Sequence, residues 1–127
     1  MTPEHTITIR VRYQETDAQG RVHHANYFTY FEMGRVEQLR AAGYDYRRME
    51  EEGTFLVVYD ISCRYLLGAC YDDVLTLTTR TTRVTGTRVF HEYEVRREET
   101  LVAQGNSVLA CVDRAGKVCR LPDWLAQ

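Results

Sequence analysis

The sequence predicts an α+β domain in which one long helix packs against an antiparallel sheet. Hydrophobic residues repeat with the period of a strand over residues 6–13, and then with the period of a helix from residue 26 to about residue 42. The rest of the chain consists of four strand-like segments separated by turn residues. The order is therefore strand, long helix and four consecutive strands, which is typical of a two-layer α+β architecture.

The first strand is predicted over Thr6–Tyr13, where apolar and polar side chains alternate. Its apolar face comprises Ile7, Ile9, Val11 and Tyr13. Alternation with a period of two is typical of a strand with one buried face. The polar run that follows, residues 15–24, contains Gly20 and indicates a tight loop.

The long helix is predicted from Asn26 to about Ala42. Aromatic and aliphatic side chains recur there at helical intervals, which gives the segment one broad apolar face. Asn26 is expected to be the N-cap, with its side chain accepting a hydrogen bond from the first turn. Gly43 is expected to end the helix, because glycine enters the left-handed region without strain. A second, short helical segment is predicted within Tyr44–Gly53.

Four further strands complete the predicted sheet. They are Thr54–Leu67, Asp73–Val84, Thr87–Arg96 and Leu101–Val112. The last of these is apolar on both faces, as expected of a central strand. A single helix covers one face of such a sheet incompletely, so we expect the chain to assemble into dimers or larger oligomers.

The composition is that of one soluble domain over residues 1–127. Sixteen basic side chains against eighteen acidic ones give a net charge of −2, without the basic footprint of nucleic-acid-binding proteins. No run of about 18 apolar residues is present, so no integral membrane association is expected. Met1–His5 lacks the charged and apolar regions of a signal peptide. The four cysteines form no Cys-x-x-Cys pair, which favours free, buried thiols in a cytoplasmic protein over a zinc site.

Asp17 lies in the loop that delivers the chain to the start of the long helix. The first N–H groups of a helix lack intrahelical partners and carry the positive end of the helix dipole. They suit a carbonyl oxygen that gains negative charge during acyl transfer, and a carboxylate beside them can attack the carbonyl or activate water. A thioester is a natural substrate, because a thiolate leaves without strong acid assistance. The alternative is that Asp17 only accepts hydrogen bonds from loop N–H groups.

Two further side chains near this loop allow more than one interpretation. His24 could orient a substrate, donate its backbone N–H or tune Asp17, or it could be a satisfied loop histidine. Tyr13 could belong to the core, although its hydroxyl would need a partner that the loop carboxylates could supply. His23 and His24 are adjacent in an extended segment and are expected to point in opposite directions, which disfavours a shared metal ion. We expect neither a metal nor a cofactor.

Arg88 is one of several cations in the predicted third and fourth strands. Such side chains usually lie on solvated faces, but they could also bind the phosphates of coenzyme A. The motifs of rival chemistries are absent from the sequence. Gly105-Asn106-Ser107 lacks the spacing of a Gly-x-Ser-x-Gly elbow, and there is no dinucleotide-binding or phosphate-binding loop.

Two segments carry a resemblance to a known family. Glu15-Thr16-Asp17-Ala18-Gln19-Gly20-Arg21-Val22-His23-His24-Ala25-Asn26-Tyr27 resembles the Asp/Glu-Thr-Asp-x-x-Gly-x-Val-x-His/Tyr-x-Asn-Tyr segment of the hotdog-fold acyl-CoA thioesterases. This family includes the 4-hydroxybenzoyl-CoA thioesterases and the thioesterases associated with the Tol-Pal cluster. Ala69-Cys70-Tyr71-Asp72-Asp73-Val74-Leu75-Thr76-Leu77 is similar to the family's Ala/Pro-x-x-Tyr-Asp-Asp-x-Leu segment. Together with the order of elements, the resemblance covers about residues 5–122.

The resemblance implies a hotdog fold, in which an antiparallel sheet wraps around one long central helix. It implies dimers with active sites at the subunit interface, often paired into tetramers. Asp17 would be the catalytic aspartate, with Tyr13 acting beside it. His24 falls where the Tol-Pal type carries a histidine and the hydroxybenzoyl type a tyrosine, and the backbone N–H at this position would polarise the thioester carbonyl.

The expected activity is hydrolysis of an acyl-CoA to a carboxylic acid and free CoA, with Asp17, His24 and Tyr13 as catalytic residues. The expected substrate-binding residues are Gly20, Ala25, Asn26 and Arg88. The alternative from another class is a non-catalytic acyl-CoA-binding or sensing module on the same fold. A hotdog hydratase would need an Asp/His pair placed differently, and the sequence offers no clear candidate. The sequence does not specify whether the acyl group is aromatic, short-chain, long-chain or naphthoyl-like.

Overall fold

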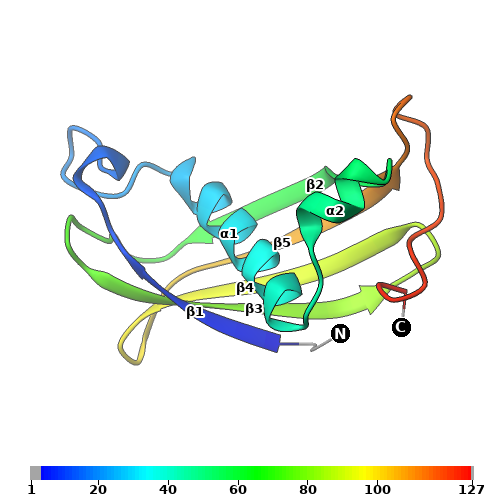
Figure 1. Cartoon of the computed structure of the whole chain (residues 1–127). Helices are drawn as coiled ribbons and strands as arrows, with labels where there is room; N and C mark the ends of the chain where they lie inside the picture. Colours follow the sequence, from blue (N-terminus) through cyan, green and yellow to red (C-terminus); the bar gives the residue numbers. More distant parts are fainter. Residues whose placement is uncertain (1–3, 127) are drawn as a thin grey trace.

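A five-stranded antiparallel sheet packs against one long helix in the computed structural model of the chain, which describes residues 4–126 (Figure 1). The strands are β1 (Glu4–Arg10), β2 (Phe55–Tyr65), β3 (Val74–Val84), β4 (Arg88–Arg97) and β5 (Thr100–Val112). The helices are α1 (Asn26–Ala41) and the short α2 (Tyr46–Glu51). The α+β class and every predicted element are thereby confirmed, while Met1–Pro3 of the segment inspected for a signal peptide lies outside the described residues.

The order of the strands in space differs from their order in the chain. β3, β4 and β5 follow one another as a meander, whereas β2 pairs with β5 and lies at the opposite edge of the sheet from β1. The outer edge of β2 and the segment after it expose several apolar side chains. This strip, called here the β2 edge, comprises Val57, Val58, Tyr59, Tyr65, Leu66 and Leu67. A break in register between Val58 and Asp60 marks a bulge within it.

The first strand is shorter than predicted. β1 ends at Arg10. The N–H of Val11 donates to the carbonyl oxygen of Asp73, and Tyr13–Glu15 then forms a 3₁₀ turn. Tyr13 is 77% exposed and does not continue the buried face of the strand. The prediction that the strand extends to Tyr13 was wrong. Apolar and polar residues still alternate in the sequence from 11 to 13, but pairing with β3 ends at Arg10.

Both ends of α1 are set by local hydrogen bonds. At the C-terminus the N–H of Tyr44 donates to the carbonyl of Leu39, and the N–H of Gly43 donates to that of Arg40. Gly43 has φ of 88°, so the predicted glycine stop is confirmed as a Schellman motif. The N-cap prediction was wrong, because Asn26 is the first helical residue and its side chain donates to the carbonyl of Glu15 at 2.8 Å.

Two glycines allow α1 to lie close to the sheet. A Cβ on Gly34 would approach Thr79 Oγ1 to 2.3 Å and Leu77 Cδ2 to 2.8 Å, both on β3. A Cβ on Gly105 of β5 would come within 2.5 Å of the Phe31 ring. Because these two glycines have no side chains, α1 can contact β3 and β5 closely. Phe31 of α1 also stacks on Tyr93 of β4, with ring centroids 4.2 Å apart.

Glu15 fastens the loop before α1 to the helix itself. Its carboxylate accepts hydrogen bonds from the Tyr30 hydroxyl at 2.8 Å, the Arg12 N–H at 2.9 Å and Arg12 Nε at 3.0 Å. Its carbonyl oxygen accepts from the N–H of His23 and the side chain of Asn26. Burial alone would raise the pKa of Glu15, but the hydrogen bonds from Arg12 and Tyr30 together hold that pKa below its ordinary value.

Replacing Gly34 with alanine should destabilise the protein, although alanine is the better helix former by about 1 kcal/mol. The added methyl group must displace Thr79 or Leu77, and overpacking of this kind costs about 1–3 kcal/mol. We expect a lower midpoint of urea unfolding than in the parent protein. Thr29→Ala, at an exposed position of the same helix, is the control and should not lower it. A Gly34→Ala protein as stable as the parent would contradict the close contact.

Glu15→Gln should lower the free energy of unfolding at pH 7 by about 1–2 kcal/mol, because the three hydrogen bonds to this side chain lose its negative charge and the amide nitrogen cannot accept one. The folded protein holds the pKa of Glu15 below 4.5. The difference between parent and variant is therefore complete above about pH 4.5 and should shrink as the pH falls through the folded pKa. Urea unfolding at several pH values measures it, with the exposed Glu99→Gln as control. A difference that grows on acidification would refute this role.

Candidate functional site

An open depression of about 410 Å³ lies beside the start of α1, where the loop containing Asp17 meets the chain that leaves β2. It is lined by Asp17, Gln19, Arg21, Val22, His24, Tyr27 and the segment Tyr65–Gly68. Two of the three residues predicted to be catalytic, Asp17 and His24, therefore share one surface. Tyr13 is not part of its lining.

The two oxygens of the Asp17 carboxylate have different surroundings. Oδ1 accepts hydrogen bonds from the N–H groups of Gln19 at 2.9 Å and Arg21 at 3.4 Å. Oδ2 accepts none from the residues that the structure describes. The loop-stabilising alternative thus holds for one oxygen, while the other is left for a ligand in the depression. Gly20, with φ of 80°, lets the loop turn so that its N–H reaches the carbonyl of Asp17 at 2.9 Å.

The backbone of His24 offers a hydrogen-bond donor at the approach to α1. Its N–H donates to no acceptor within residues 4–126, whereas the N–H of Ala25 donates to His23 Nδ1 and that of Asn26 to the carbonyl of His23. Ala25 and Asn26 therefore shape the turn with N–H groups that are already used. Position 24 is the one at which the family resemblance implies a contact to the thioester carbonyl.

The rings of His23 and His24 stack on each other, with centroids 4.2 Å apart and planes inclined by 28°. The prediction that they point in opposite directions was wrong, because the chain turns at His24 instead of staying extended. Among the described residues, no group of three or more histidine, cysteine, aspartate or glutamate side chains is arranged to hold a metal ion. Stacking therefore gives this pair a packing contact.

Tyr65 and Tyr27 are functional candidates that the sequence analysis missed. The Tyr65 hydroxyl donates to the carbonyl of His24 at 3.1 Å, and its ring meets the edge of Tyr27 at a centroid distance of 5.4 Å. Burial raises the pKa of Tyr27 to about 12, so its hydroxyl stays neutral. Tyr65 lies 41 residues from His24 in the chain, and no local pattern signals their contact.

The second family-like segment, residues 69–77, contacts the Asp17 loop through backbone hydrogen bonds. The N–H of Val22 donates to the carbonyl of Ala69 at 2.8 Å, and Arg21 forms an isolated bridge with Cys70. Asp73 holds the turn by accepting from the N–H of Cys70 at 2.8 Å and from Arg97 at 3.0 Å. These contacts give the segment a structural role close to the depression.

Two of the predicted site residues, Tyr13 and Arg88, do not line the Asp17 depression within one subunit. Tyr13 packs edge-on against Tyr71, with ring centroids 5.5 Å apart. Arg88 lies over the ring of Tyr59 at 4.2 Å, near the start of β4. β5 pairs with Arg88 through Ala110 and with Tyr65 through Ala103, a separation of about 23 Å along the strand. The structure therefore brings Asp17, Gly20 and His24 together, but not these two.

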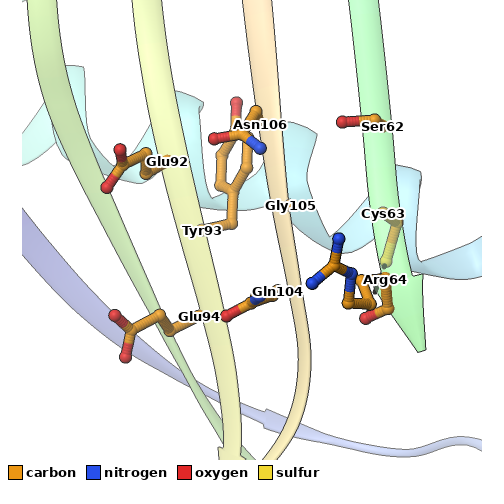
Figure 2. Close-up of a pocket in the computed structure, with 9 residues that line it drawn as sticks. All are labelled: Ser62, Cys63, Arg64, Glu92, Tyr93, Glu94, Gln104, Gly105 and Asn106. Atoms are coloured by element: carbon orange, nitrogen blue, oxygen red, sulfur yellow. Dashed lines mark hydrogen bonds between the residues drawn. The ribbon is translucent and has the colours of Figure 1, made fainter. Parts of the chain in front are cut away.

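A second depression of about 410 Å³ lies on the face of the sheet turned away from α1, as Figure 2 shows. Its polar wall is built by Ser62, Arg64, Glu92, Glu94, Gln104 and Asn106 from β2, β4 and β5. Two of its carboxylates pair with neighbouring cations, Glu94 with Arg96 at 2.7 Å and Glu92 with Arg80 at 3.7 Å. None of the predicted site residues lines this second depression. The two depressions have the same volume, so the presence of Asp17 and His24 identifies the first one as the candidate site.

The cysteines are free thiols. Cys111 is buried and Cys70 is exposed, so the expectation of burial fails for Cys70, which lies in the exposed turn before β3. Burial raises the pKa of Cys111 to about 12, which keeps this thiol protonated and unreactive. Within residues 4–126, no helix has the length and hydrophobicity needed to cross a bilayer.

Known proteins are similar to this chain in sequence and in fold. The model of the thioesterase-like superfamily matches residues 11–127. The acyl-CoA thioesterase YbgC of Haemophilus influenzae is 33% identical over 109 residues, covering 85% of this chain and 80% of that protein. The acyl-CoA thioester hydrolase YbgC of Escherichia coli is 35% identical over 106 residues, covering 83% and 79%.

Solved structures give the same result. The DHNA-CoA thioesterase from Staphylococcus aureus superposes with a TM-score of 0.92 at 29% identity, covering 96% of this chain and 86% of that one. A protein from Aquifex aeolicus superposes with a TM-score of 0.91 at 35% identity, covering 95% of each chain. These matches establish that the chain belongs to the thioesterase-like superfamily and is a hotdog-fold thioester hydrolase.

Proposed function

We propose that the protein is an acyl-CoA thioesterase, which hydrolyses a CoA thioester to a carboxylic acid and free CoA, with Asp17 as the catalytic carboxylate. One observation carries the proposal: Asp17 Oδ2 and the N–H of His24 both lack protein partners within residues 4–126, and both residues line one depression. A carboxylate and a backbone donor on one surface are what attack on a polarised carbonyl requires.

The thioester oxygen accepts a hydrogen bond from the N–H of His24, where the start of α1 also favours negative charge. Asp17 Oδ2 either attacks the carbonyl carbon, which gives a mixed anhydride that water opens, or removes a proton from the attacking water. Both routes release the thiolate of CoA, which takes up a proton. Tyr65 holds the carbonyl of His24 and so fixes the direction of the donor.

Cations near the depression fit the anionic CoA. Arg21 lines it and forms no ion pair with a carboxylate among the described residues. Arg97, by contrast, is engaged by Asp73 at 3.0 Å. Arg21 therefore joins Arg88 as a candidate for binding phosphates, and the exposed Gly20 leaves the approach open. The proposal also places the protein in the cytoplasm, because its cysteines are free thiols, as is usual in that reducing compartment.

The functional unit in this proposal is a homodimer formed through the β2 edge. β2 is an outer strand of the sheet, so one side of its backbone has no ladder partner, and it carries the exposed apolar side chains of the β2 edge. Such an edge promotes pairing with another strand. Antiparallel pairing of two β2 strands places the start of one beside the end of the other. Arg88 and Tyr59 of one subunit then approach the Asp17 depression of the second, as the expected role of Arg88 requires.

Asp17→Asn should reduce turnover of acyl-CoA by at least about a hundredfold while leaving the fold intact, because asparagine keeps the Oδ1 contacts and loses the negative charge. Release of CoA is measured with a thiol reagent. Asp113→Asn is a matched control, since Asp113 Oδ1 accepts from the N–H groups of Ala115 and Lys117 in a loop of the same kind. Its activity should equal that of the parent.

Two outcomes would contradict the catalytic assignment. Undiminished turnover in Asp17→Asn would show that Asp17 only stabilises its loop. Tight binding of CoA esters without turnover, unchanged in Asp17→Asn, would identify the non-catalytic module instead. With an active parent, a single turnover in ¹⁸O-labelled water identifies an anhydride that water opens at the Asp17 carbonyl. That opening leaves ¹⁸O in Asp17 and an unlabelled Asp17 oxygen in the product, whereas the general-base route labels only the product.

Val57→Lys should convert the dimer into a monomer, because a lysine on an outer strand opposes strand pairing. Light scattering coupled to gel filtration measures the mass in solution. Val118→Lys, at another exposed apolar position that is 60% exposed and outside the β2 edge, is the control and should leave the mass unchanged. A parent protein that is monomeric at the concentration of the activity assay would refute the homodimer and, with it, the homotetramer.

A further inference from the structure

A third cavity, of about 380 Å³, is lined by residues of α1, α2, β2, β4 and β5. Its apolar wall comprises Val36, Leu39, Leu56, Val58, Val89 and Leu109. Glu32, Arg35, Tyr46 and Glu50 add polar groups to the same lining. An apolar cavity of this size with a few polar groups is typical of small-molecule sites.

His91 of β4 stands in the wall of this cavity with unused hydrogen-bonding capacity. The residue is 6% exposed, and its Nδ1 is buried without a hydrogen-bond partner. None of the hydrogen bonds among the described residues involves its ring. Burial and the nearby Arg35 cation lower the pKa of His91 to about 3, so the ring is neutral at pH 7 and has one donor and one acceptor nitrogen.

Arg35 gives the cavity a second polar anchor. Its Nη1 donates to the hydroxyl of Tyr93 at 3.0 Å, and that hydroxyl lies 2.5 Å from the Ser107 hydroxyl. Arg35 forms no ion pair with a carboxylate among residues 4–126, although Glu32 and Glu50 also line the cavity. These two carboxylates oppose an anionic ligand, whereas a neutral hydroxyl can both donate and accept hydrogen bonds here.

We infer that this cavity binds the acyl group of the substrate and selects acyl groups that carry a hydroxyl, with His91 as the specificity-determining residue. The inference rests on the proposed acyl-CoA thioesterase function and names its substrate class. The apolar wall contacts the hydrocarbon part of the acyl group, and its hydroxyl supplies the partner that the imidazole lacks. An acyl group without a hydroxyl leaves that ring unpaired in an apolar wall, which disfavours binding.

The proposed dimer connects this cavity with the reaction site. Within one subunit, Arg35 is nine residues beyond the start of α1, or about 13 Å along the helix axis. Leu56 and Val58, near the start of β2, form one wall of the cavity. In an antiparallel β2 pair they lie beside the end of the second β2, where Tyr65–Gly68 lines the Asp17 depression. A thioester held at one subunit's Asp17 would place its acyl group in the other subunit's cavity.

The test uses two matched pairs of acyl-CoAs: ω-hydroxydecanoyl-CoA with decanoyl-CoA, and para-hydroxyphenylacetyl-CoA with phenylacetyl-CoA. Turnover is compared as kcat/KM, and binding of the corresponding non-hydrolysable thioethers is measured by calorimetry. The parent should prefer the hydroxylated member of at least one pair by about tenfold, the amount expected for one net hydrogen bond. His91→Leu should abolish the preference by lowering kcat/KM for the hydroxylated member to that of the unsubstituted one. His5→Leu on β1, outside all three cavities, is the matched control and should keep the preference.

The outcomes separate this inference from the proposed function. CoA esters that are hydrolysed without a preference for the hydroxyl, or with a preference that His91→Leu retains, overturn the inference and leave the thioesterase assignment in place. Absence of both turnover and binding for every acyl-CoA overturns the proposed function and the inference with it. Because loss of folding could imitate loss of preference, Val36→Phe provides a second variant. It should fill the cavity and weaken binding of both members of a pair equally, at an unchanged circular dichroism spectrum.

Discussion

The candidate site depends on the buried carboxylate of Glu15, which joins the loop before α1 to the helix. Through Tyr30 it reaches one turn into α1, and through Arg12 it closes the 3₁₀ turn that follows β1. The carbonyl of the same residue accepts from Asn26 at the first position of the helix. Asp17 is two residues further along the chain, so its position relative to the helix start is set by these contacts. A charged group that is buried must be paired in this way, because an unpaired one would destabilise the fold.

The close approach of α1 to the sheet has consequences at both ends of the helix. Gly34 and Gly105 remove the side chains that would separate the two layers, and the helix rests on β3 through Leu77 and Thr79. At its N-terminal end the helix presents its start to the Asp17 depression. At its C-terminal end, packing leaves the cavity that contains His91. The start of α1 thus serves the proposed reaction site of its own subunit. The end of the same helix lines the proposed acyl site for a substrate that reacts at the other subunit of the dimer.

The edge position of β2 connects the fold with the proposed assembly. The strand order places β2 beside β5 and leaves its outer side unpaired, with Val57 and Tyr59 exposed. Arg88 is about 23 Å along β5 from Tyr65, and in the proposed dimer a second copy brings it near the thioester. Tyr13 is exposed on the outside of the loop, and its part in catalysis stays a prediction.

The sequence by itself determined the class of fold, the limits of most elements and the loop that contains the candidate catalytic residue Asp17. These follow from local physics: side-chain periodicity decides between strand and helix, and Gly43 ends α1 because it tolerates a positive φ. It also marked Asp17 and His24, through a motif that spans consecutive residues. Its errors were at the places where a distant segment decides the outcome. Asn26 donates to Glu15 instead of capping the helix, and Tyr13 leaves the strand when the ladder ends.

Only the tertiary structure decided which residues surround Asp17 and which side chains are left without partners. Tyr65 reaches His24 across 41 residues of chain, and β2 lies beside β5 although β3 follows it in sequence. The sequence gives equally little sign of the unpaired Nδ1 of His91, because His91 simply alternates with less buried neighbours along its strand. Pairing and burial are relations between segments that chain folding brings together, and no local pattern contains them.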